Sequence, residues 1–275
     1  MPSVRKKAEA ASSGDGRVRG FSAFEGDPDF VLSLARGLQV IRAFEGHTVG
    51  QSVADIARRT DLSRAAVRRL LMTLQVLGYA ESDGHVYRLT THVLKLGFSY
   101  LSSTPLPILA QPLLEHITEV VHESSSLSVA DGDEIVYIAR STANRVMSVG
   151  LSVGSRLPAY CTSMGRVLLA ALPDDRLDAY LKRVIATVHT PKTATDKKRL
   201  KEILLRVRLD SYAVVDEELE LGLRSIAVPV RTRNGRAIAA MNIGIHAARA
   251  TLPEMVERFL PILQENARSL AQVLL

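Results

Sequence analysis

Residues 52–74, SVADIARRTDLSRAAVRRLLMTL, contain two helix signals separated by only three residues. Each helical stretch follows a serine, and serine is a favoured N-cap because its hydroxyl accepts a backbone N–H of the first turn. Ser52 therefore predicts a short helix over residues 53–59, and Ser63 predicts a longer one over residues 64–77. Two helices joined by so tight a turn are typical of a helix-turn-helix.

A further helix and a hairpin extend this pattern on both sides. Apolar side chains recur at helical spacing over residues 31–44, with Ser33 as the expected N-cap. Residues 79–80 and 86–89 are short β-like runs that flank the turn sequence SDGH, in which Asp-Gly is a hairpin signal. The order of helices and hairpin predicts a winged helix-turn-helix over residues 30–90.

The second helix of the motif has one apolar side and one basic side. The apolar side, expected to face the core, is formed by Val67, Leu70, Leu71 and Leu74. The opposite side of its first turns carries Ser63, Arg64, Ala65, Arg68 and Arg69. In helix-turn-helix proteins this half of the helix enters the major groove, where arginine binds guanine or phosphate. We expect these five residues to contact DNA, with His85 and Arg88 of the hairpin touching the flanking backbone. The alternative is a solvated helix face, which is what most charge runs are.

The remaining segments of the chain have distinct compositions. Residues 1–29 are rich in Gly, Ser, Ala and charged residues and are expected to be a disordered basic tail. Residues 91–106 are expected to be a linker helix, with a domain boundary marked by Pro105 and Pro107. Residues 107–275 then form the second domain. Its predicted elements are helices and mostly antiparallel strands, so the fold class is α+β.

Composition restricts the compartment and the partners. The chain has one cysteine, no apolar run long enough for a membrane helix and no signal peptide at its start, so we expect a cytoplasmic protein that does not bind membranes. The formal net charge is +6, which favours polyanionic partners only weakly. The position of the arginines is therefore the stronger indication of double-stranded DNA as a partner.

Polar and apolar residues of the second domain indicate a pocket for a small acid. Tyr160-Cys161-Thr162-Ser163 precedes an apolar helix over residues 162–172, and the start of a helix with hydroxyl side chains suits a carboxylate. The apolar wall is expected to come from Met147, Val149, Leu151, Leu223 and Ala227, on strands that include residues 145–152. Asn242 is expected to bond a ring hydroxyl or a carbonyl of the ligand. A helix cap and ordinary core packing are the alternative for each of these residues.

The sequence resembles the IclR family of bacterial regulators. The similar segments are SLARGLQVIRAF (33–44), SVADIA (52–57), LSRAAVRR (62–69), LGY (77–79), YRLT (87–90), VGSRLPAYCTSMGRVLLA (153–170), DEE (216–218) and GLRSIAVPV (222–230). The sequence of residues 157–165 is most similar to those of the branch that controls aromatic-acid catabolism, such as the protocatechuate and 4-hydroxybenzoate regulators. The segments occur in the family order and span roughly residues 30–275.

The resemblance implies a winged helix-turn-helix joined by a helix to a GAF-like effector-binding domain. Family members form dimers, or pairs of dimers, on palindromic operators. By this resemblance, the ligand contacts would fall on residues around Cys161 and Thr162, on Leu223 and Ser225, and on Asn242 with Gly244. The effector would be a small organic acid, expected to be an aromatic carboxylate, and the regulated genes would belong to aromatic-acid catabolism and the β-ketoadipate pathway.

Three other functions are consistent with parts of the pattern. They are an enzyme that processes a small molecule and carries a nucleic-acid-binding appendage, a protein that only binds DNA, and a regulator of this family that responds to a non-aromatic acid. The enzyme hypothesis lacks a histidine placed to activate Cys161. No clustered metal ligands and no phosphate-binding glycine loop occur, so neither a metal nor a cofactor is expected. Arg140 is expected to form a surface ion pair, with a bond to a ligand carboxylate as the alternative. Residues 216–220 are expected to form a solvated turn, with Glu217 or Glu218 at the pocket rim as the alternative.

Overall fold

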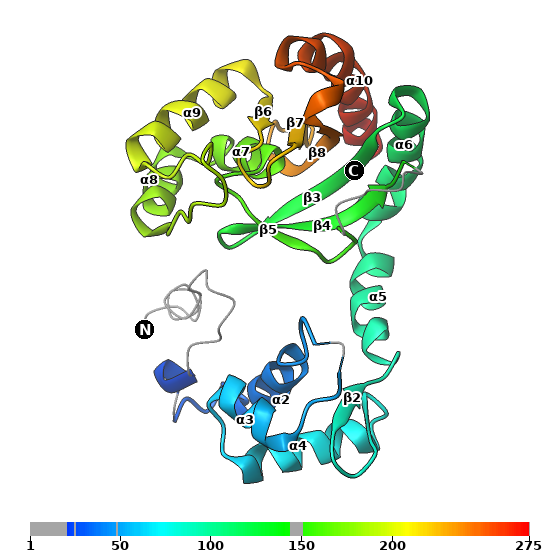
Figure 1. Cartoon of the computed structure of the whole chain (residues 1–275), viewed down its shortest axis with the longest axis vertical. Helices are drawn as coiled ribbons and strands as arrows, with labels where there is room; N and C mark the ends of the chain where they lie inside the picture. Colours follow the sequence, from blue (N-terminus) through cyan, green and yellow to red (C-terminus); the bar gives the residue numbers. More distant parts are fainter. Residues whose placement is uncertain (1–20, 25, 48, 144–150, 275) are drawn as a thin grey trace. The chain divides into compact units, whose positions relative to one another are not determined.

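A computed structural model describes residues 21–274 apart from residues 25, 48 and 144–150. The chain divides into two compact units between Tyr100 and Leu101, which are described separately below (Figure 1). The predicted strand over residues 145–152 and the first 20 residues of the expected tail lie largely or wholly outside the described residues.

Three helices form the core of the first unit. They are α2 (Leu32–Arg42), α3 (Val53–Thr60) and α4 (Arg64–Val76). Ser52 and Asp55 form a capping box at the start of α3, and the Ser63 hydroxyl accepts the N–H of Ala66 at the start of α4, so both predicted caps are confirmed. The helices meet through buried apolar side chains, which include Val40, Ile56, Val67, Leu71 and Leu74.

Two predictions for the start of this unit are wrong. Ser33 does not cap α2, because the helix already begins at Leu32 and its N-cap, Val31, makes no side-chain bond. Part of the expected disordered tail is folded: a 3₁₀ turn, η1 (Phe21–Phe24), places the Phe24 ring 4.5 Å from the Phe30 ring in a stacked arrangement. Aromatic packing stabilises this turn although the local sequence is rich in polar residues.

The predicted hairpin is present and has a third partner. Strands β1 (Ala80–Ser82) and β2 (Tyr87–Leu89) are antiparallel, and Gly84 supplies the positive φ, 95°, that the turn needs. Gln51 exchanges two backbone hydrogen bonds with Tyr87 (2.8 and 2.9 Å), which ties the start of the helix-turn-helix to the wing. Helix α5 (Val93–Ser103) follows, and none of its residues is buried.

The second unit is a six-stranded antiparallel sheet with helices on both faces (Figure 1). The strand order is β5-β4-β3-β8-β7-β6. The strands are β3 (Ser124–Asp131), β4 (Glu134–Ser141), β5 (Arg156–Pro158), β6 (Ala213–Asp216), β7 (Leu223–Arg231) and β8 (Ala237–His246). The helices are α6 (Pro105–Val121), α7 (Ser163–Ala170), α8 (Asp174–Arg183), α9 (Lys197–Asp210) and α10 (Leu252–Val273). The α+β fold class is thereby confirmed.

Two hydrophobic cores form, one on each face of the sheet. Helices α6 and α10 pack on the face that presents Leu127, Ile226 and Met241. Helices α7, α8 and α9 pack on the other face, which presents Ile135 and Ala240. The first turn of α6 contains Pro105 and Pro107, so these prolines begin a helix and do not form a loop between domains.

Helix α7 lies unusually close to the chain that precedes it. A Cβ atom added at Gly165 would lie 2.2 Å from the carbonyl oxygen of Ala159 and 2.3 Å from its Cα. Because the obstacle is backbone, no side-chain rotation relieves it. Glycine at position 165 therefore allows the first turn of α7 to lie against residue 159 at the edge of the sheet.

We predict that Gly165→Ala lowers the free energy of unfolding of the second unit by at least about 2 kcal/mol, since α7 must move away from the sheet. Denaturant titration of the full chain, followed by far-UV circular dichroism, measures the change. Gly244→Ala is the matched control, because an added Cβ at Gly244 meets no heavy atom within 4 Å. Equal stability of the two variants would contradict the packing described for α7.

Candidate functional site

The basic side of α4 is exposed in the first unit, as predicted. Ser63, Arg64, Ala65, Arg68 and Arg69 are all exposed, whereas Val67 and Leu71 on the opposite side are buried. None of the three arginines forms an ion pair with another described residue. The helix therefore presents an exposed cationic face, which is the kind of surface that helix-turn-helix proteins place in a major groove.

The wing adds two exposed residues, one of which is partly neutralised. His85 lies in the β1–β2 turn, and Arg88 pairs with Asp83 at 3.1 Å. Asp83 also accepts the backbone N–H groups of His85 and Val86 at 3.0 Å, and these bonds hold the pKa of its carboxyl far below the usual range. Two exposed arginines on α3, Arg58 and Arg59, were not predicted.

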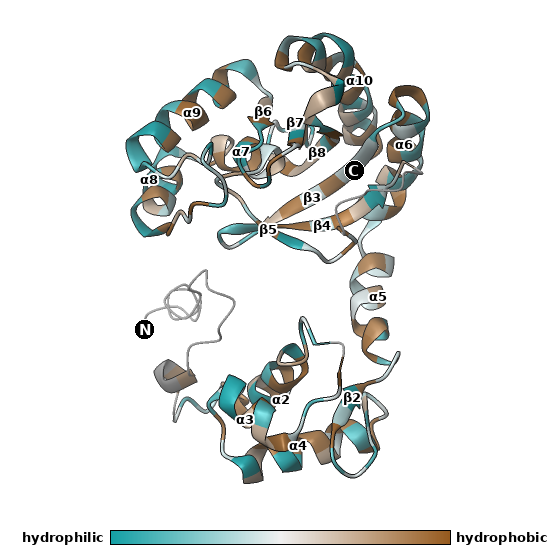
Figure 2. Ribbon diagram, viewed as in Figure 1, coloured by the Kyte–Doolittle hydropathy of each residue, from teal (hydrophilic) through white to brown (hydrophobic). Residues whose placement is uncertain are grey.

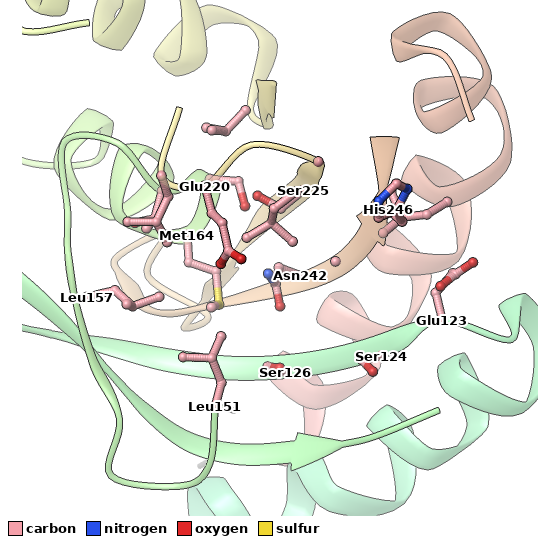
Figure 3. Close-up of a pocket in the computed structure, with 18 of the residues that line it drawn as sticks. Glu123, Ser124, Ser126, Leu151, Leu157, Met164, Glu220, Ser225, Asn242 and His246 are labelled. Carbon is pink, nitrogen blue, oxygen red and sulfur yellow. The ribbon is translucent and has the colours of Figure 1, made fainter. Parts of the chain in front are cut away.

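The second unit contains a cavity of about 520 Å³ on the α7 face of the sheet (Figure 3). It has apolar and polar walls. The apolar lining includes Tyr137, Leu151, Leu157, Met164, Val215 and Leu219. The volume is in the range of small-molecule sites in proteins.

Polar side chains reach this cavity from strands that are distant in sequence. The register places Ser126 opposite Arg140 on one side and Asn242 on the other, in one row across the sheet. The parallel row joins Ser124, Gly244 and Ser225. All these residues line the cavity, and the missing side chain of Gly244 leaves room within it.

Arg140 is the charged group in the row beside Asn242. Its Nη1 donates to the Ser126 hydroxyl at 3.0 Å, and its Nε is buried without a hydrogen-bond partner. Desolvation lowers the pKa of the guanidinium, and no described carboxylate pairs with it. The expected surface ion pair is therefore wrong: Arg140 is a cation at a cavity wall, and it lacks a counterion among the described residues.

The start of α7 forms the opposite wall, but its groups differ in availability. Thr162 is the N-cap, and its hydroxyl is already used: it donates to the carbonyl of Pro158 (2.9 Å) and accepts the N–H of Gly165 (3.2 Å). The Ser163 hydroxyl is buried without a partner. Burial raises the pKa of the Cys161 thiol to about 12, so this cavity-lining thiol stays protonated and is a poor nucleophile.

Two of the residues expected at the cavity, Tyr160 and Ala227, are not placed there, and Val149 lies, like Met147, outside the described residues. Tyr160 points away, because its hydroxyl donates to the carbonyl of Thr187 (2.7 Å) and accepts the Thr187 N–H (2.9 Å). Ala227 is fully buried in the core below the cavity. Cys161, Thr162, Ser163, Leu223, Ser225, Asn242 and Gly244 do line the cavity.

The acidic loop between β6 and β7 is also different from the solvated turn that the sequence suggested. Glu218 is largely buried and pairs with Arg166 of α7, whereas Glu220 lines the cavity (Figure 3). Alternation of charged and apolar residues in this loop does not reveal which glutamate turns inward. The sequence also gave no signal for Ser124, Ser126 and Glu220 as lining residues.

The described part of the chain has neither a metal-ligand cluster nor a membrane-spanning helix. No three His, Cys, Asp or Glu side chains among residues 21–274, the undescribed positions excepted, are grouped to hold a metal ion. No described helix is long and apolar enough to cross a membrane.

A winged helix-turn-helix with a basic recognition face, together with a unit that encloses a small-molecule cavity, defines a ligand-responsive transcription regulator. Family models match both units: the IclR helix-turn-helix domain over residues 33–84 and the C-terminal domain of bacterial IclR transcriptional regulators over residues 98–272. The chain belongs to the IclR family.

Two curated relatives span nearly the whole chain. The Pca regulon regulatory protein of Pseudomonas putida is 52% identical over 253 residues, which are 92% of this chain and 87% of the relative. The p-hydroxybenzoate hydroxylase transcriptional activator of Acinetobacter baylyi is 38% identical over 88% of this chain and 91% of its own.

Solved structures agree with the fold. A transcriptional regulator of Rhodococcus sp. RHA1 is 50% identical and matches with a TM-score of 0.80 over 88% of this chain and 98% of its own. An IclR homologue of Microbacterium hydrocarbonoxydans, complexed with 4-hydroxybenzoate, is 25% identical and matches with a TM-score of 0.75 over 87% of this chain and 98% of its own.

Proposed function

We propose that this regulator binds a small aromatic carboxylate in the α7-side cavity and that binding changes its affinity for a palindromic operator. The observation that supports the anion is Arg140, a partly buried guanidinium at the cavity wall without a carboxylate partner among the described residues. Burying a cation is unfavourable unless an anion compensates it. A ligand carboxylate that accepts from Arg140 would supply that compensation.

The aromatic part of the proposal rests on the apolar walls and on the relatives. Leu151, Leu157 and Met164 offer surfaces for a flat ring, while Ser163, Ser225 and Asn242 offer polar groups around it. One similar structure holds 4-hydroxybenzoate, and one relative is named for p-hydroxybenzoate hydroxylase. We propose a hydroxylated benzoate as the effector and genes of aromatic-acid catabolism as the targets. We propose that the chain acts as a regulator and not as an enzyme, and that it acts in the cytoplasm, where its operator DNA would be.

The exposed basic face of α4 and the α7-side cavity suggest a role for each part of the chain. We assign DNA binding to residues 30–90, effector binding to residues 107–275 and their connection to the helix between them. A ligand shifts the equilibrium between two arrangements of a regulator only as far as its affinities for the two arrangements differ. We therefore expect the effector to act by changing the spacing of paired recognition helices through this connection.

The first prediction concerns the recognition helix. Arg64→Ala and Arg68→Ala should each cost about 1–3 kcal/mol in binding to an operator selected from random duplexes, if each side chain contacts a base. Gel-shift titration at fixed salt measures the loss, with Arg258→Ala as the control because Arg258 is exposed on α10 of the other unit. Operator affinity that equals the control in both variants would show that α4 does not read the sequence.

Self-association is proposed from the surface of α5. Leu94 is 71% exposed and Leu96 is 47% exposed, and apolar colouring runs along much of this helix (Figure 2). So much apolar surface on one connecting helix favours packing against a second copy. Pairing would also give the two half-site contacts that a palindromic operator requires.

We therefore predict a dimer, or a dimer of dimers, in sedimentation at micromolar concentration. Leu94→Glu should shift the distribution toward monomer, because a charge in a packed apolar interface is costly. Leu209→Glu is the control, since Leu209 is 80% exposed on α9 and lies outside the proposed interface. A wild-type monomer, with and without operator DNA, would refute the proposal.

The third prediction tests the effector site. Arg140→Met should weaken binding of 4-hydroxybenzoate by about ten- to a hundredfold, because a charge-assisted hydrogen bond contributes about 1.5–3 kcal/mol. Calorimetry with 4-hydroxybenzoate, protocatechuate and short non-aromatic acids measures the affinities. Arg236→Met, an exposed arginine of the β7–β8 turn, is the control. If the wild type binds a non-aromatic acid more tightly than the two benzoates, the proposal of an aromatic effector is wrong. If Arg140→Met binds 4-hydroxybenzoate as tightly as the wild type, the carboxylate does not bind at Arg140.

A further inference from the structure

The loop of residues 217–222 forms one wall of the cavity without any helix or strand of its own. It contributes Leu219, Glu220, Leu221 and Gly222 to the lining. The loop is closed by a bond from the N–H of Gly222 to the carboxylate of Glu217 (2.8 Å). Lys192 holds its outer side through ion pairs with Glu217 (2.6 Å) and Asp216 (2.8 Å).

One buried ion pair attaches the inner side of this loop to α7. Nη1 and Nη2 of Arg166 donate to the two carboxylate oxygens of Glu218 at 2.6 and 2.7 Å. The Arg166 side chain is 3% exposed and that of Glu218 is 12% exposed. Arg166 also donates to the carbonyl of Tyr160 (2.9 Å), and Glu218 accepts the N–H of Ala194 (2.9 Å). The planar, doubly bonded geometry fixes the orientation of residue 218 as well as its position.

Glu220 lies two residues further along the loop and extends into the cavity. Its carboxylate approaches the space beside the Asn242 amide (Figure 3). The Glu220 carboxylate makes no hydrogen bond or ion pair with another described residue, whereas the Glu220 backbone carbonyl accepts the N–H of Leu223 (3.2 Å). The other acidic side chain in the lining, Glu123, pairs with Arg249 at 3.0 Å. Glu220 is exposed to solvent and lines the cavity, and its carboxylate oxygens have no donor from another described residue.

We propose that the Arg166–Glu218 ion pair positions Glu220 to accept a hydrogen bond from an effector hydroxyl, and so sets a preference for hydroxylated over non-hydroxylated acids. The proposal rests on the proposed function, because it concerns the same cavity. Arg166 and Glu218 do not line the cavity, so they are positioning residues, whereas Glu220 contacts the effector.

The chemistry follows from the donors and acceptors in the cavity. A carboxylate side chain has acceptor capacity only, and a ring hydroxyl supplies a donor. An acid without that hydroxyl would leave the Glu220 carboxylate against ring C–H groups after water has been displaced, which is unfavourable. Polar recognition of this kind discriminates strongly because the analogue leaves a polar protein group unpaired.

The test is the ratio of the dissociation constants of benzoate and 4-hydroxybenzoate, measured by calorimetry on the full chain. We expect the wild type to prefer 4-hydroxybenzoate by about tenfold or more. Glu220→Ala should bring the ratio close to one, and Glu220→Gln should keep part of it, because the amide oxygen still accepts. A ratio near one in the wild type, or an unchanged ratio in Glu220→Ala, would overturn the role of Glu220.

The positioning role is tested by replacing the whole ion pair. Arg166→Met combined with Glu218→Met removes both charges together, which avoids an uncompensated buried ion and preserves the fold better than either single change. We expect the ratio of the two dissociation constants in this double variant to fall to the square root of the wild-type ratio or lower. Thermal unfolding of the double variant should stay cooperative. Arg183→Met is the control, because it removes the exposed ion pair with Asp133 in the same unit.

Two outcomes separate this inference from the proposed function. If the double variant unfolds cooperatively and keeps the wild-type ratio, the ion pair is only structural and the positioning role is refuted. If the double variant does not fold, Arg166→Lys, which keeps the charge but loses the doubly bonded geometry, must lower the ratio for the inference to stand. If the wild type binds neither acid, the proposed function itself fails and this inference fails with it.

Discussion

A guanidinium that lines a cavity without a counterion among the described residues is the constraint on which the proposed effector site depends. Arg140 gives one hydrogen bond to Ser126, while its Nε remains unpartnered and buried. An isolated buried cation lowers stability unless a ligand or another side chain compensates it. We therefore expect an anion to stabilise the second unit more than a neutral molecule of the same size would.

The antiparallel sheet makes this arrangement possible. Its register brings Arg140, Ser126 and Asn242 into one row, although they belong to three strands and are up to 116 residues apart in the sequence. Side chains alternate between the two faces of a strand, so the same strands supply Leu127 and Ile243 to the core on the opposite face. Gly165 completes the cavity by allowing α7 to lie close to the sheet edge.

Local signals predicted the first unit well and the cavity only in part. The caps at Ser52 and Ser63 involve bonds within three residues, so they are visible in the sequence. Ser33 is not the cap because α2 already begins at Leu32, one residue before it. The lining role of Arg140 depends on strand register and on the absence of a partner, and the burial of Glu218 depends on an arginine 52 residues away. Neither relation can be deduced from neighbouring residues. Tyr160 was assigned to the cavity because it precedes α7, yet its hydroxyl bonds to Thr187, also distant in sequence.

The most direct measurement is the crystal structure of the protein with 4-hydroxybenzoate bound. We predict that the ring lies between the start of α7 and the sheet, with its carboxylate within hydrogen-bond distance of the Arg140 guanidinium. A carboxylate bound at another group, with Arg140 still without an anion, would contradict it.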